Sequence, residues 1–401
     1  KRRDKVKKIL FVYPSMGIGG STTSLLSLLN EIDYNKYEVD LQLYENKGVY
    51  LDQIPDKVHL LPQARVFSQK KWVGLLQRGF YPIYWYYGFL AQIMSKKYKN
   101  PQVGSQLTSY ARAKTARGNN KEYDVAVGFL ELWSNSYVYS KIKAKRKIAW
   151  FHLDYQKSGL MPSVDKKVFE KFTQIVLVSE ECLKSFVQVF PEYEEKAVYI
   201  ENILSRKVVA ERAEEITKDF YKGKGIDIIT VCRIDFRHKG LDRAAEVFKR
   251  LKNDGYVFKW HIVGEGQDFE KLKEKIRESG MENDIVLYGA KANPHPYVKQ
   301  CDLFLLPSVF EGKPMAVTEA QMLGIPTAVT HYSSAPEQVT DKVNGLIMEN
   351  CEEGIYEGLK YILDNPDVLK TWKKNIECET WSYKNVLKQL DELFLEEDVN
   401  Y

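Results

Sequence analysis

The sequence lacks the features that mark membrane-spanning and secreted proteins. No apolar run of about 18 residues, the length a helix needs to cross a bilayer, occurs in its 401 residues. The basic start KRRDKVKK leads directly into KILFVY, without the apolar stretch and small-residue cleavage site of a secretory signal. We therefore expect a cytoplasmic protein whose only contact with the cell membrane, if any, is peripheral and on the cytoplasmic face.

Cysteine and histidine are also scarce. The five cysteines are scattered and never spaced as C-x-x-C, which favours reduced thiols that pack as small hydrophobic side chains. The six histidines form no H-x-x-x-H or H-E-x-x-H pattern, so we expect neither a metal nor a bound cofactor. The cysteines are Cys182, Cys232, Cys301, Cys351 and Cys378.

Acidic residues are missing from one long segment. Residues 57–121 contain twelve Lys and Arg but no Asp or Glu, although the whole chain carries only +5. Within this segment, residues 72–98 are rich in aromatic side chains, which suits the headgroup layer of an anionic membrane. The alternative is a buried helical pair whose aromatics fill a core. Nucleic acid is a weaker candidate partner, because no recognised nucleic-acid module accompanies the charge. The aromatic residues are Trp72, Phe80, Tyr81, Tyr84, Trp85, Tyr86, Tyr87 and Phe89.

The remaining pattern predicts an α/β protein with two Rossmann-like domains. The length allows two separate cores. Short apolar runs such as KKILFVY, YEVDLQLY and KRKIAWFH alternate with helical patterns in the first half. These patterns include a helix with Leu25, Leu26, Leu28 and Leu29 at its apolar positions and a helix at 180–189. The second half repeats the alternation with five strands, IDIITVCR, VFKWHIVG, DIVLYG, CDLFLLPS and IPTAVT. A polar stretch separates the halves. We predict domains at 1–204, with the basic aromatic insert 57–121, and at 205–375, and a terminal helix in 376–401 that packs back toward the first domain.

Candidate site residues follow these strands, because ligands bind at the carboxyl ends of parallel strands. Gly17–Gly20 precede a helix that Ser21 can cap, so their amides can approach an anion, although a tight turn needing positive φ explains them equally well. His152 leaves the carboxyl end of another strand and would face the crevice. The alternative is a hydrogen-bonded structural histidine. Gly264 ends a third strand, and glycines in this position are common in any α/β protein.

Four cations follow the strand IDIITVC, namely Arg233, Arg237, Lys239 and, when it is protonated, His238. Arg233 supplies bidentate phosphate contacts and Lys239 a point charge, close to a helix that begins near Gly240. We expect Arg233 to be partly sheltered by its apolar strand context. The alternative is a solvated basic turn.

Two carboxylates frame the loop after CDLFLLPS. Glu311 lies in that loop and Glu319 in the helix that the loop opens. The helix N-terminus between them suits a diphosphate, while the carboxylates can accept hydrogen bonds from sugar and ribose hydroxyls.

In this order, these features resemble the GT-B glycosyltransferases of family four. The pattern E-G-x-P-x-x-x-x-E-A is matched by Glu311 to Ala320, and the R…KG pair by Arg233 and Lys239-Gly240. The stretch from Pro336 to Leu346 also fits, and the N-terminal glycines and W-x-H-x-D look like those of bacterial capsule and exopolysaccharide transferases. The sequence departs from the family pattern at Lys313, where some relatives carry Phe, Gly or Leu. This loop therefore does not identify the sugar.

The resemblance implies two Rossmann-like domains that face each other across a cleft, and metal-free, retaining transfer from a nucleotide-sugar to a glycan or lipid-linked acceptor. Arg233 and Lys239 would bind the diphosphate, Glu311 the transferred sugar and Glu319 the ribose. His152 would line the reaction centre. By analogy, the donor is expected to be a UDP-hexose. The implied donor-binding residues are Gly19, Gly20, Arg233, Lys239, Gly264, Gly312, Lys313, Pro314, Met315, Ala316 and Glu319.

Two other functions remain as alternatives. A nicotinamide oxidoreductase is also doubly wound, but the G-x-G-x-x-G fingerprint is incomplete, since position 22 is Thr. A non-catalytic GT-B scaffold or sugar-sensing partner of a glycosyltransferase would have no need of all four residues Arg233, Lys239, Glu311 and Glu319.

Overall fold

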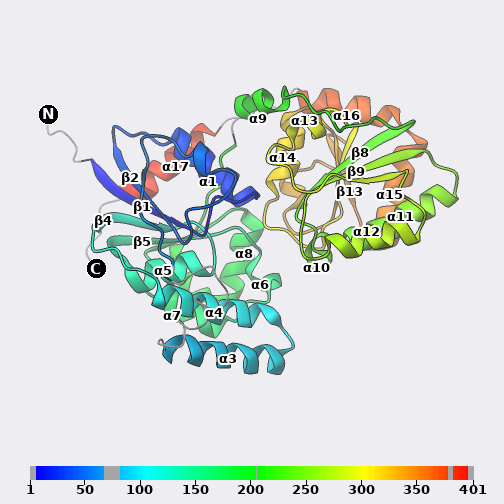
Figure 1. Ribbon diagram of the computed structural model, residues 1–401. Coiled ribbons are helices and arrows are strands. Elements are labelled where there is room, and N and C mark those ends of the chain that lie inside the picture. Colours follow the sequence, from blue (N-terminus) through cyan, green and yellow to red (C-terminus); the bar gives the residue numbers. More distant parts are fainter. Residues whose placement is uncertain (1–5, 67–81, 205, 378–382, 396–401) are drawn as a thin grey trace. The chain divides into compact units, whose positions relative to one another are not determined.

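The computed structural model describes residues 6–66, 82–204, 206–377 and 383–395, and it divides the chain into two compact units (Figure 1). The first unit contains residues 1–17, 21–202 and 384–401, and the second contains residues 18–20 and 203–383. The main division thus falls between residues 202 and 203, beside the polar stretch in which the sequence places the boundary.

The first unit is built on a seven-stranded parallel sheet with the order β3-β2-β1-β4-β5-β6-β7. Consecutive strands that run outward in both directions from a central β1 are typical of a doubly wound sheet. The two-residue β3 is too short for a sequence pattern to predict. The strands are β1 (Lys7–Tyr13), β2 (Tyr37–Leu43), β3 (His59–Leu60), β4 (Glu122–Gly128), β5 (Lys143–Phe151), β6 (Gln174–Leu177) and β7 (Ala197–Tyr199).

Helices surround this sheet. The four leucines of α1 that the pattern assigns to the core are all buried, but α1 begins at Gly20, so Ser21 lies inside its first turn and is not the expected cap. The Ser21 hydroxyl instead hydrogen-bonds with the hydroxyl of Tyr13, at 2.7 Å. The helices are α1 (Gly20–Glu31), η1 (Leu51–Gln53), α3 (Pro82–Tyr98), α4 (Pro101–Thr115), α5 (Trp133–Lys141), α6 (Tyr155–Ser158), α7 (Pro162–Phe169), α8 (Glu180–Val189), η2 (Pro191–Lys196) and α17 (Lys384–Leu395).

The C-terminal helix α17 belongs to the first unit although it follows the whole second unit in the chain. Its Phe394 ring meets Phe11 of β1 and Tyr37 of β2 edge to face, with ring centroids 6.2 and 5.8 Å apart. Lys7 Nζ donates to the carbonyl of Phe394 at 3.1 Å, and Arg146 Nη1 of β5 donates to that of Leu393 at 2.8 Å. Apolar packing and satisfied end carbonyls together fix the helix on this unit.

The second unit contains a six-stranded parallel sheet with the order β10-β9-β8-β11-β12-β13. The sequence predicts five of these strands. It misses β13, because a four-residue run beginning with glycine gives little pattern to detect. The strands are β8 (Ile226–Val231), β9 (Phe258–Val263), β10 (Ile285–Leu287), β11 (Leu303–Leu306), β12 (Thr327–Thr330) and β13 (Gly345–Met348).

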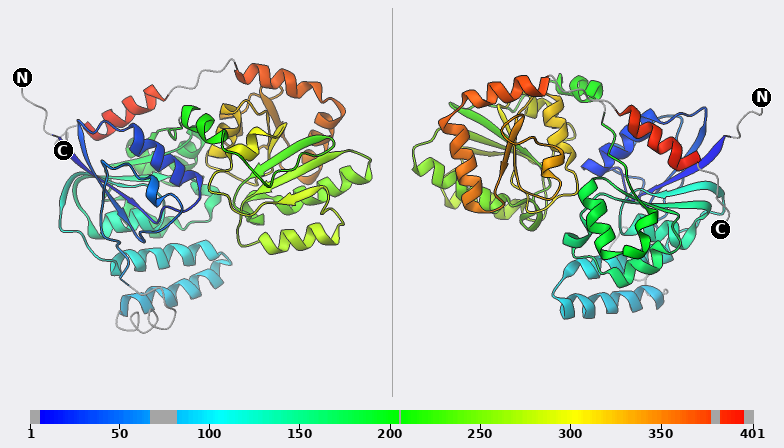
Figure 2. Two further views of the ribbon diagram at one scale, coloured as in Figure 1. Left: turned by 45° about the horizontal axis from the view of Figure 1, so that its top comes forward. Right: turned by 180° about the vertical axis from the view of Figure 1, so that it is seen from behind.

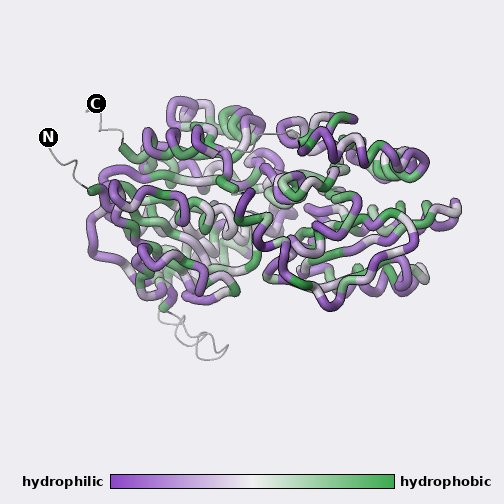
Figure 3. The backbone as a smooth tube through the Cα atoms, turned by 90° about the horizontal axis from the view of Figure 1, so that it is seen from above, coloured by the Kyte–Doolittle hydropathy of each residue, from purple (hydrophilic) through white to green (hydrophobic). Residues whose placement is uncertain are grey.

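The helices of the second unit are amphipathic and enclose a sheet that is apolar on both faces. Trp260 of β9 is fully buried and stacks on Phe248 of α11, with ring centroids 4.4 Å apart. Green and purple stretches alternate along the outer helices in Figure 3, as expected for helices with one buried face. The helices are α9 (Arg206–Ala213), α10 (Phe236–Lys239), α11 (Leu241–Asn253), α12 (Phe269–Glu278), α13 (His295–Lys299), α14 (Met315–Met322), η3 (Ala335–Glu337), α15 (Glu352–Asp364) and α16 (Asp367–Glu377).

The basic aromatic insert forms a helical hairpin of α3 and α4, visible below the first unit's sheet in Figure 1. Only Ala91 of α3 is buried, whereas Trp85, Tyr86 and Phe89 are exposed. The interpretation that these aromatics fill a core is therefore wrong for Trp85, Tyr86 and Phe89, whereas Tyr87 packs against the small cluster between α3 and α4. Trp72, Phe80 and Tyr81 lie outside the described residues.

None of the helices within the described ranges is long and apolar enough to cross a membrane.

The cysteines fit the expected role only in part. Cys182 and Cys301 are buried and Cys232 is partly buried, and burial raises the pKa of Cys232 to about 12. Cys351 is exposed, and its Sγ caps the start of α15 by accepting from the Gly354 amide at 3.3 Å, so it is not a core residue. Cys378 lies outside the described residues.

Candidate functional site

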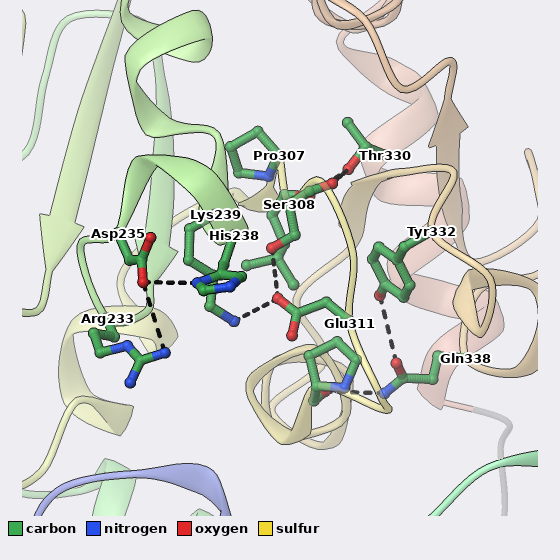
Figure 4. A network of polar contacts seen from close by, with 12 residues as sticks. Arg233, Asp235, His238, Lys239, Pro307, Ser308, Glu311, Thr330, Tyr332 and Gln338 are labelled. Atoms are coloured by element: carbon green, nitrogen blue, oxygen red, sulfur yellow. Dashed lines mark hydrogen bonds and ion pairs between the residues drawn. The ribbon is translucent and has the colours of Figure 1, made fainter. Parts of the chain in front are cut away.

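Two neighbouring strands of the second unit carry the best-connected polar groups. Strands β8 and β11 pair in parallel, with Ile228 opposite Leu303, so their carboxyl ends lie at the same edge of the sheet. The loop and short α10 after β8 supply Arg233 and Lys239, and the loop after β11 supplies Ser308 and Glu311 (Figure 4).

Lys239 and Glu311 form an ion pair at the centre of this network. Lys239 Nζ lies 2.5 Å from Glu311 Oε1, and the two side chains are only 18% and 11% exposed. The Ser308 hydroxyl donates to the same oxygen at 2.5 Å, and Thr330 Oγ1 donates to the Ser308 carbonyl at 2.5 Å. Glu311 Oε1 therefore accepts both side-chain hydrogen bonds, which orients the carboxylate and leaves Oε2 for a ligand hydroxyl.

Arg233 is exposed rather than partly sheltered as expected. Its side chain is 68% accessible, because β8 ends at Val231 and the residue stands in the loop beyond the sheet. Its one described ionic partner is Asp235, with Nη2 3.8 Å from Oδ2. The same carboxylate oxygen lies 2.7 Å from Nδ1 of His238, whose ring packs edge to face on Phe310. Asp235 is buried and thus anchors the flexible Arg233 side chain to a fixed loop.

Gly264 allows close packing against the loop that carries Arg233. Its φ of +152° is unfavourable for other residues, and a Cβ built there would lie 1.9 Å from the carbonyl oxygen of Cys232. The amide of Ile234 donates to the carbonyl of Glu265 at 2.9 Å, which holds the two loops together. Because Gly264 has no side chain, the loop that bears Arg233 can pack closely against it. This structural role does not depend on whether Gly264 also contacts a donor.

Glu319 does not join the Lys239–Glu311 pair. It lies on α14 and faces His295 of α13, with 3.6 Å between Oε2 and the ring Nε2. The exposed fractions of the two side chains are 12% and 4%. Both ring nitrogens of His295 are buried without a hydrogen-bond partner among the described residues, so the contact with Glu319 is the polar interaction that the structure gives this ring.

Residues 312–316 form the entry to α14. Pro314 is its N-cap, and the side-chain amide of Gln338 donates to the Pro314 carbonyl at 3.0 Å and to Thr318 Oγ1 at 2.8 Å. The side chain of Met315 packs into a small apolar cluster, so any ligand contact from Met315 must come from its backbone. Of the first-turn amides, that of Val317 donates to the Pro314 carbonyl at 3.2 Å, whereas those of Met315 and Ala316 precede the helical hydrogen-bond pattern and suit an anion. Gly312 is buried in this loop.

Lys313 is paired with a carboxylate. Its Nζ lies 3.7 Å from Glu337 Oε2, and its side chain is only 9% exposed. Its positive charge is thus compensated within the protein.

His152 lies in the first unit, just beyond β5. Burial lowers the pKa of His152 to about 4, against a smaller opposing effect of its hydrogen bond with the Phe129 backbone. The ring is therefore neutral at neutral pH, and its buried Nε2 has no hydrogen-bond partner among the described residues. Asp154 of the same motif caps α6 and accepts from Ser185 at 2.5 Å, which is a structural role.

Gly19 and Gly20 are exposed and Gly17 is partly buried, and none of the three has a positive φ. The alternative of a tight turn that needs positive φ is therefore wrong, and contact of Gly19 and Gly20 with phosphate stays a prediction.

Within the described ranges, no group of three His, Cys, Asp or Glu side chains is placed to hold a metal ion.

Sequence reasoning missed four polar residues that position the site. Ser308 ends the strand pattern CDLFLLPS and could have been found from that position alone. Asp235 lies within the basic motif, where the pattern draws attention to the cations, among them His238. His295 and Gln338 carry no local signal, because only the fold brings them to α14.

Comparisons with known proteins concern the family and the fold. Residues 211–378 match the family model of glycosyl transferases group 1. The chain is 26% identical over 388 residues to N-acetylgalactosamine-N,N'-diacetylbacillosaminyl-diphospho-undecaprenol 4-alpha-N-acetylgalactosaminyltransferase of Campylobacter jejuni, covering 94% of this chain and 95% of that protein. It is 33% identical over 144 residues to the amylovoran biosynthesis glycosyltransferase AmsK of Erwinia amylovora, about a third of each chain (34% and 34%).

The fold comparison covers the whole chain. The crystal structure of Anabaena HepE in complex with UDP and glucose superposes with a TM-score of 0.69 at 14% identity, covering 98% of this chain and 100% of that one. At this identity the likeness establishes the fold. The group 1 family match over residues 211–378, the full-length similarity to the Campylobacter jejuni transferase and the two parallel-sheet Rossmann-like units together support a GT-B, family-four-like glycosyltransferase.

Proposed function

We propose that this glycosyltransferase is a retaining, metal-independent enzyme that moves a hexose from a UDP-sugar to a lipid-linked glycan in the synthesis of a bacterial surface polysaccharide. The observation that carries the proposal is the Lys239–Glu311 pair, fixed by Ser308 and set beside the exposed guanidinium of Arg233.

The second unit offers each part of a nucleotide-sugar its own group. Arg233 and Lys239 present cations, and the amides of α14 present a helix N-terminus, both suited to a diphosphate. Glu319 lies one turn further along α14, held by His295, and can accept from the ribose hydroxyls. Glu311 Oε2 can accept from a hydroxyl of the transferred sugar.

The chemistry is a substitution on one face of the sugar. The bond from the anomeric carbon to the diphosphate oxygen breaks, and the acceptor oxygen bonds to the same face of that carbon. The acceptor proton passes to the departing phosphate oxygen. Negative charge develops on the diphosphate, so Arg233 and Lys239 stabilise the transition state more than the bound donor. The carboxylate of Glu311 holds Lys239 in place and orients the sugar.

The choice of donor and acceptor rests on the relatives. The name of the Campylobacter jejuni relative describes an acceptor linked to diphospho-undecaprenol, and the Anabaena structure contains UDP and glucose. These support a lipid-linked acceptor and a UDP-sugar donor here. A lipid-linked acceptor would bring the enzyme to the cytoplasmic face of the membrane.

A thermal-shift screen of UDP, GDP, ADP and their sugar conjugates, with EDTA present, tests the proposal. We expect stabilisation by UDP and a UDP-hexose, since a ligand that binds only the folded state raises its stability. Slow release of sugar from the same conjugate would show an active transferase. Stabilisation by another base alone would overturn the UDP assignment, and no shift without a divalent ion would overturn metal independence. A donor that binds without hydrolysis or transfer would favour a non-catalytic sugar sensor.

A further inference from the structure

Helix α3 presents large apolar side chains on the face turned away from α4. Trp85, Phe89 and Ile93 recur four residues apart, so they share one side of the helix, and Tyr86 flanks them. Their exposed fractions are 57%, 64%, 44% and 60% respectively. We call these four residues the outer face of α3. Both views in Figure 2 show α3 as the outermost element of its hairpin.

The opposite side of α3 is fully used in holding the hairpin together. Tyr87, Leu90 and Met94 pack against the cluster formed by Ala91, Val103 and Leu107. Helix α3 therefore presents large apolar side chains on two opposite sides, although Lys96 and Lys97 make its last turn basic. Within the described chain nothing covers the outer face, and four adjacent large apolar side chains are more than the scattered exposure of an ordinary surface.

Charge indicates what covers this face. Lys96 and Lys97 in the last turn of α3 and Lys99 just beyond it are exposed, and no Asp or Glu occurs anywhere in 57–121. Aromatic side chains with adjacent lysines match the headgroup layer of a bilayer, where the rings lie at the interface and the ammonium groups meet lipid phosphates. A second copy of the chain fits less well, because a symmetric contact would set like charges against each other.

We propose that the outer face of α3 inserts into the headgroup layer of an anionic membrane, with Lys96, Lys97 and Lys99 on the lipid phosphates. The contact rests on α3 and not on the donor site. It deepens the proposed function by stating how the enzyme would reach a lipid-linked acceptor.

Flotation of the full chain with vesicles tests the inference. We expect binding to phosphatidylglycerol-containing vesicles that is several-fold weaker on pure phosphatidylcholine and falls further in high salt. Replacing the aromatic core of the face, W85S/F89S/I93S, should lower vesicle affinity about tenfold or more, and K96E/K97E/K99E should abolish the preference for anionic lipid. A matched variant of exposed apolar residues in the second unit, I216S/Y221S, should bind like the wild type; Ile216 is 90% and Tyr221 66% exposed.

Two further readings separate the possible outcomes. Circular dichroism and the UDP-induced thermal shift must be unchanged in each variant, which shows that the fold and the donor site are intact. Vesicle binding without any nucleotide binding would leave this inference standing while the proposed function fails. No binding by the wild type, or equal binding by the W85S/F89S/I93S variant, would overturn it. A wild-type dimer that this variant converts to a monomer, without vesicle binding, would show instead that the face joins two copies.

Discussion

At the scale of single residues, Arg233 gives the sharpest separation of catalysis from stability. Because its side chain is 68% exposed, Arg233→Ala should fold normally. Loss of one charged contact at a developing charge commonly costs about 2–4 kcal/mol, so kcat should fall by about 30- to 1000-fold with little change in KM for the donor. Steady-state kinetics of sugar transfer provide the measurement.

A matched control is Arg250→Ala, which removes another exposed arginine of the second unit, paired there with Glu353. It should leave kcat unchanged. Equal effects of the two substitutions would mean that Arg233 acts only through the overall charge of the unit.

His152 makes a pH-dependent contribution to the stability of the first unit. Its folded pKa of about 4 lies below the ordinary value of 6.5, so the unfolded chain takes up the proton first as the pH falls. This stabilisation is fully present above about pH 6.5. As the pH falls toward 4, the free energy of unfolding decreases by at most about 3 kcal/mol. Protection factors for a peptide spanning β5, which correct for the slower intrinsic amide exchange at lower pH, should therefore fall over this range in the wild type and less in His152→Gln.

His331→Gln serves as the control, since His331 is exposed and belongs to the second unit. Its exchange profile at β5 should follow the wild type. An unchanged profile for His152→Gln as well would contradict the buried, neutral state of the ring.

The residue scale also shows what the sequence could reveal about the site. The motif predicts Lys239 and Glu311, and the structure brings them together because β8 and β11 are neighbours in the sheet. Glu319 was predicted, but its partner His295 was not, since a histidine on a five-residue helix carries no spacing signal. The exposure of Arg233 was misjudged, because the apolar pattern of a strand does not show where the strand stops.

At the scale of elements, a substitution at Gly264 tests how closely its loop packs against the loop that carries Arg233. Gly264→Ala should displace the loop that carries Arg233, because the new Cβ would lie 1.9 Å from the Cys232 carbonyl oxygen. We expect a lower melting temperature, from a strain of about 1–3 kcal/mol, together with weaker UDP binding. Thermal unfolding and calorimetric titration with UDP measure the two effects.

Gly255→Ala supplies the comparison. Gly255 also has a positive φ, +90°, but a Cβ there would have nothing within 4 Å. It should cost backbone strain without affecting UDP binding. If both variants lost binding equally, the steric account of Gly264 would be wrong.

Regular elements were predictable in proportion to their length and periodicity. Helix α8 occupies the predicted residues 180–189, and the leucines of α1 are buried as their spacing indicates. The two-residue β3 escaped because it gives no period. The four-residue β13 escaped although β11 and β12 are no longer, because its run begins with glycine. The outer face of α3 could not be assigned either, since apolar side chains on opposite sides of the helix do not indicate which side is buried.

At the scale of the whole molecule, the sequence predicts a terminal helix in 376–401 that packs back toward the first domain. Amphipathic spacing predicts a helix with one apolar face, but it does not say which domain that face meets. The structure assigns the helix to the first unit through Phe394, which is fully buried against Phe11 and Tyr37.

Phe394→Ala should therefore destabilise the first unit and spare the donor site. Removal of a buried phenylalanine commonly costs about 3–5 kcal/mol, from lost apolar burial and the cavity that remains. Because all the proposed diphosphate and ribose contacts except Gly19 and Gly20 come from residues after 203, UDP affinity should change less than about threefold at temperatures where the first unit stays folded.

Leu395→Ala, at a neighbouring side chain that is 40% exposed, should cost less than about 1 kcal/mol. Urea unfolding followed by hydrogen exchange of β1 and β8 peptides reports the two units separately. Earlier exchange in β1 with β8 unaffected is the expected result, whereas equal loss in both would show that the two units unfold as one.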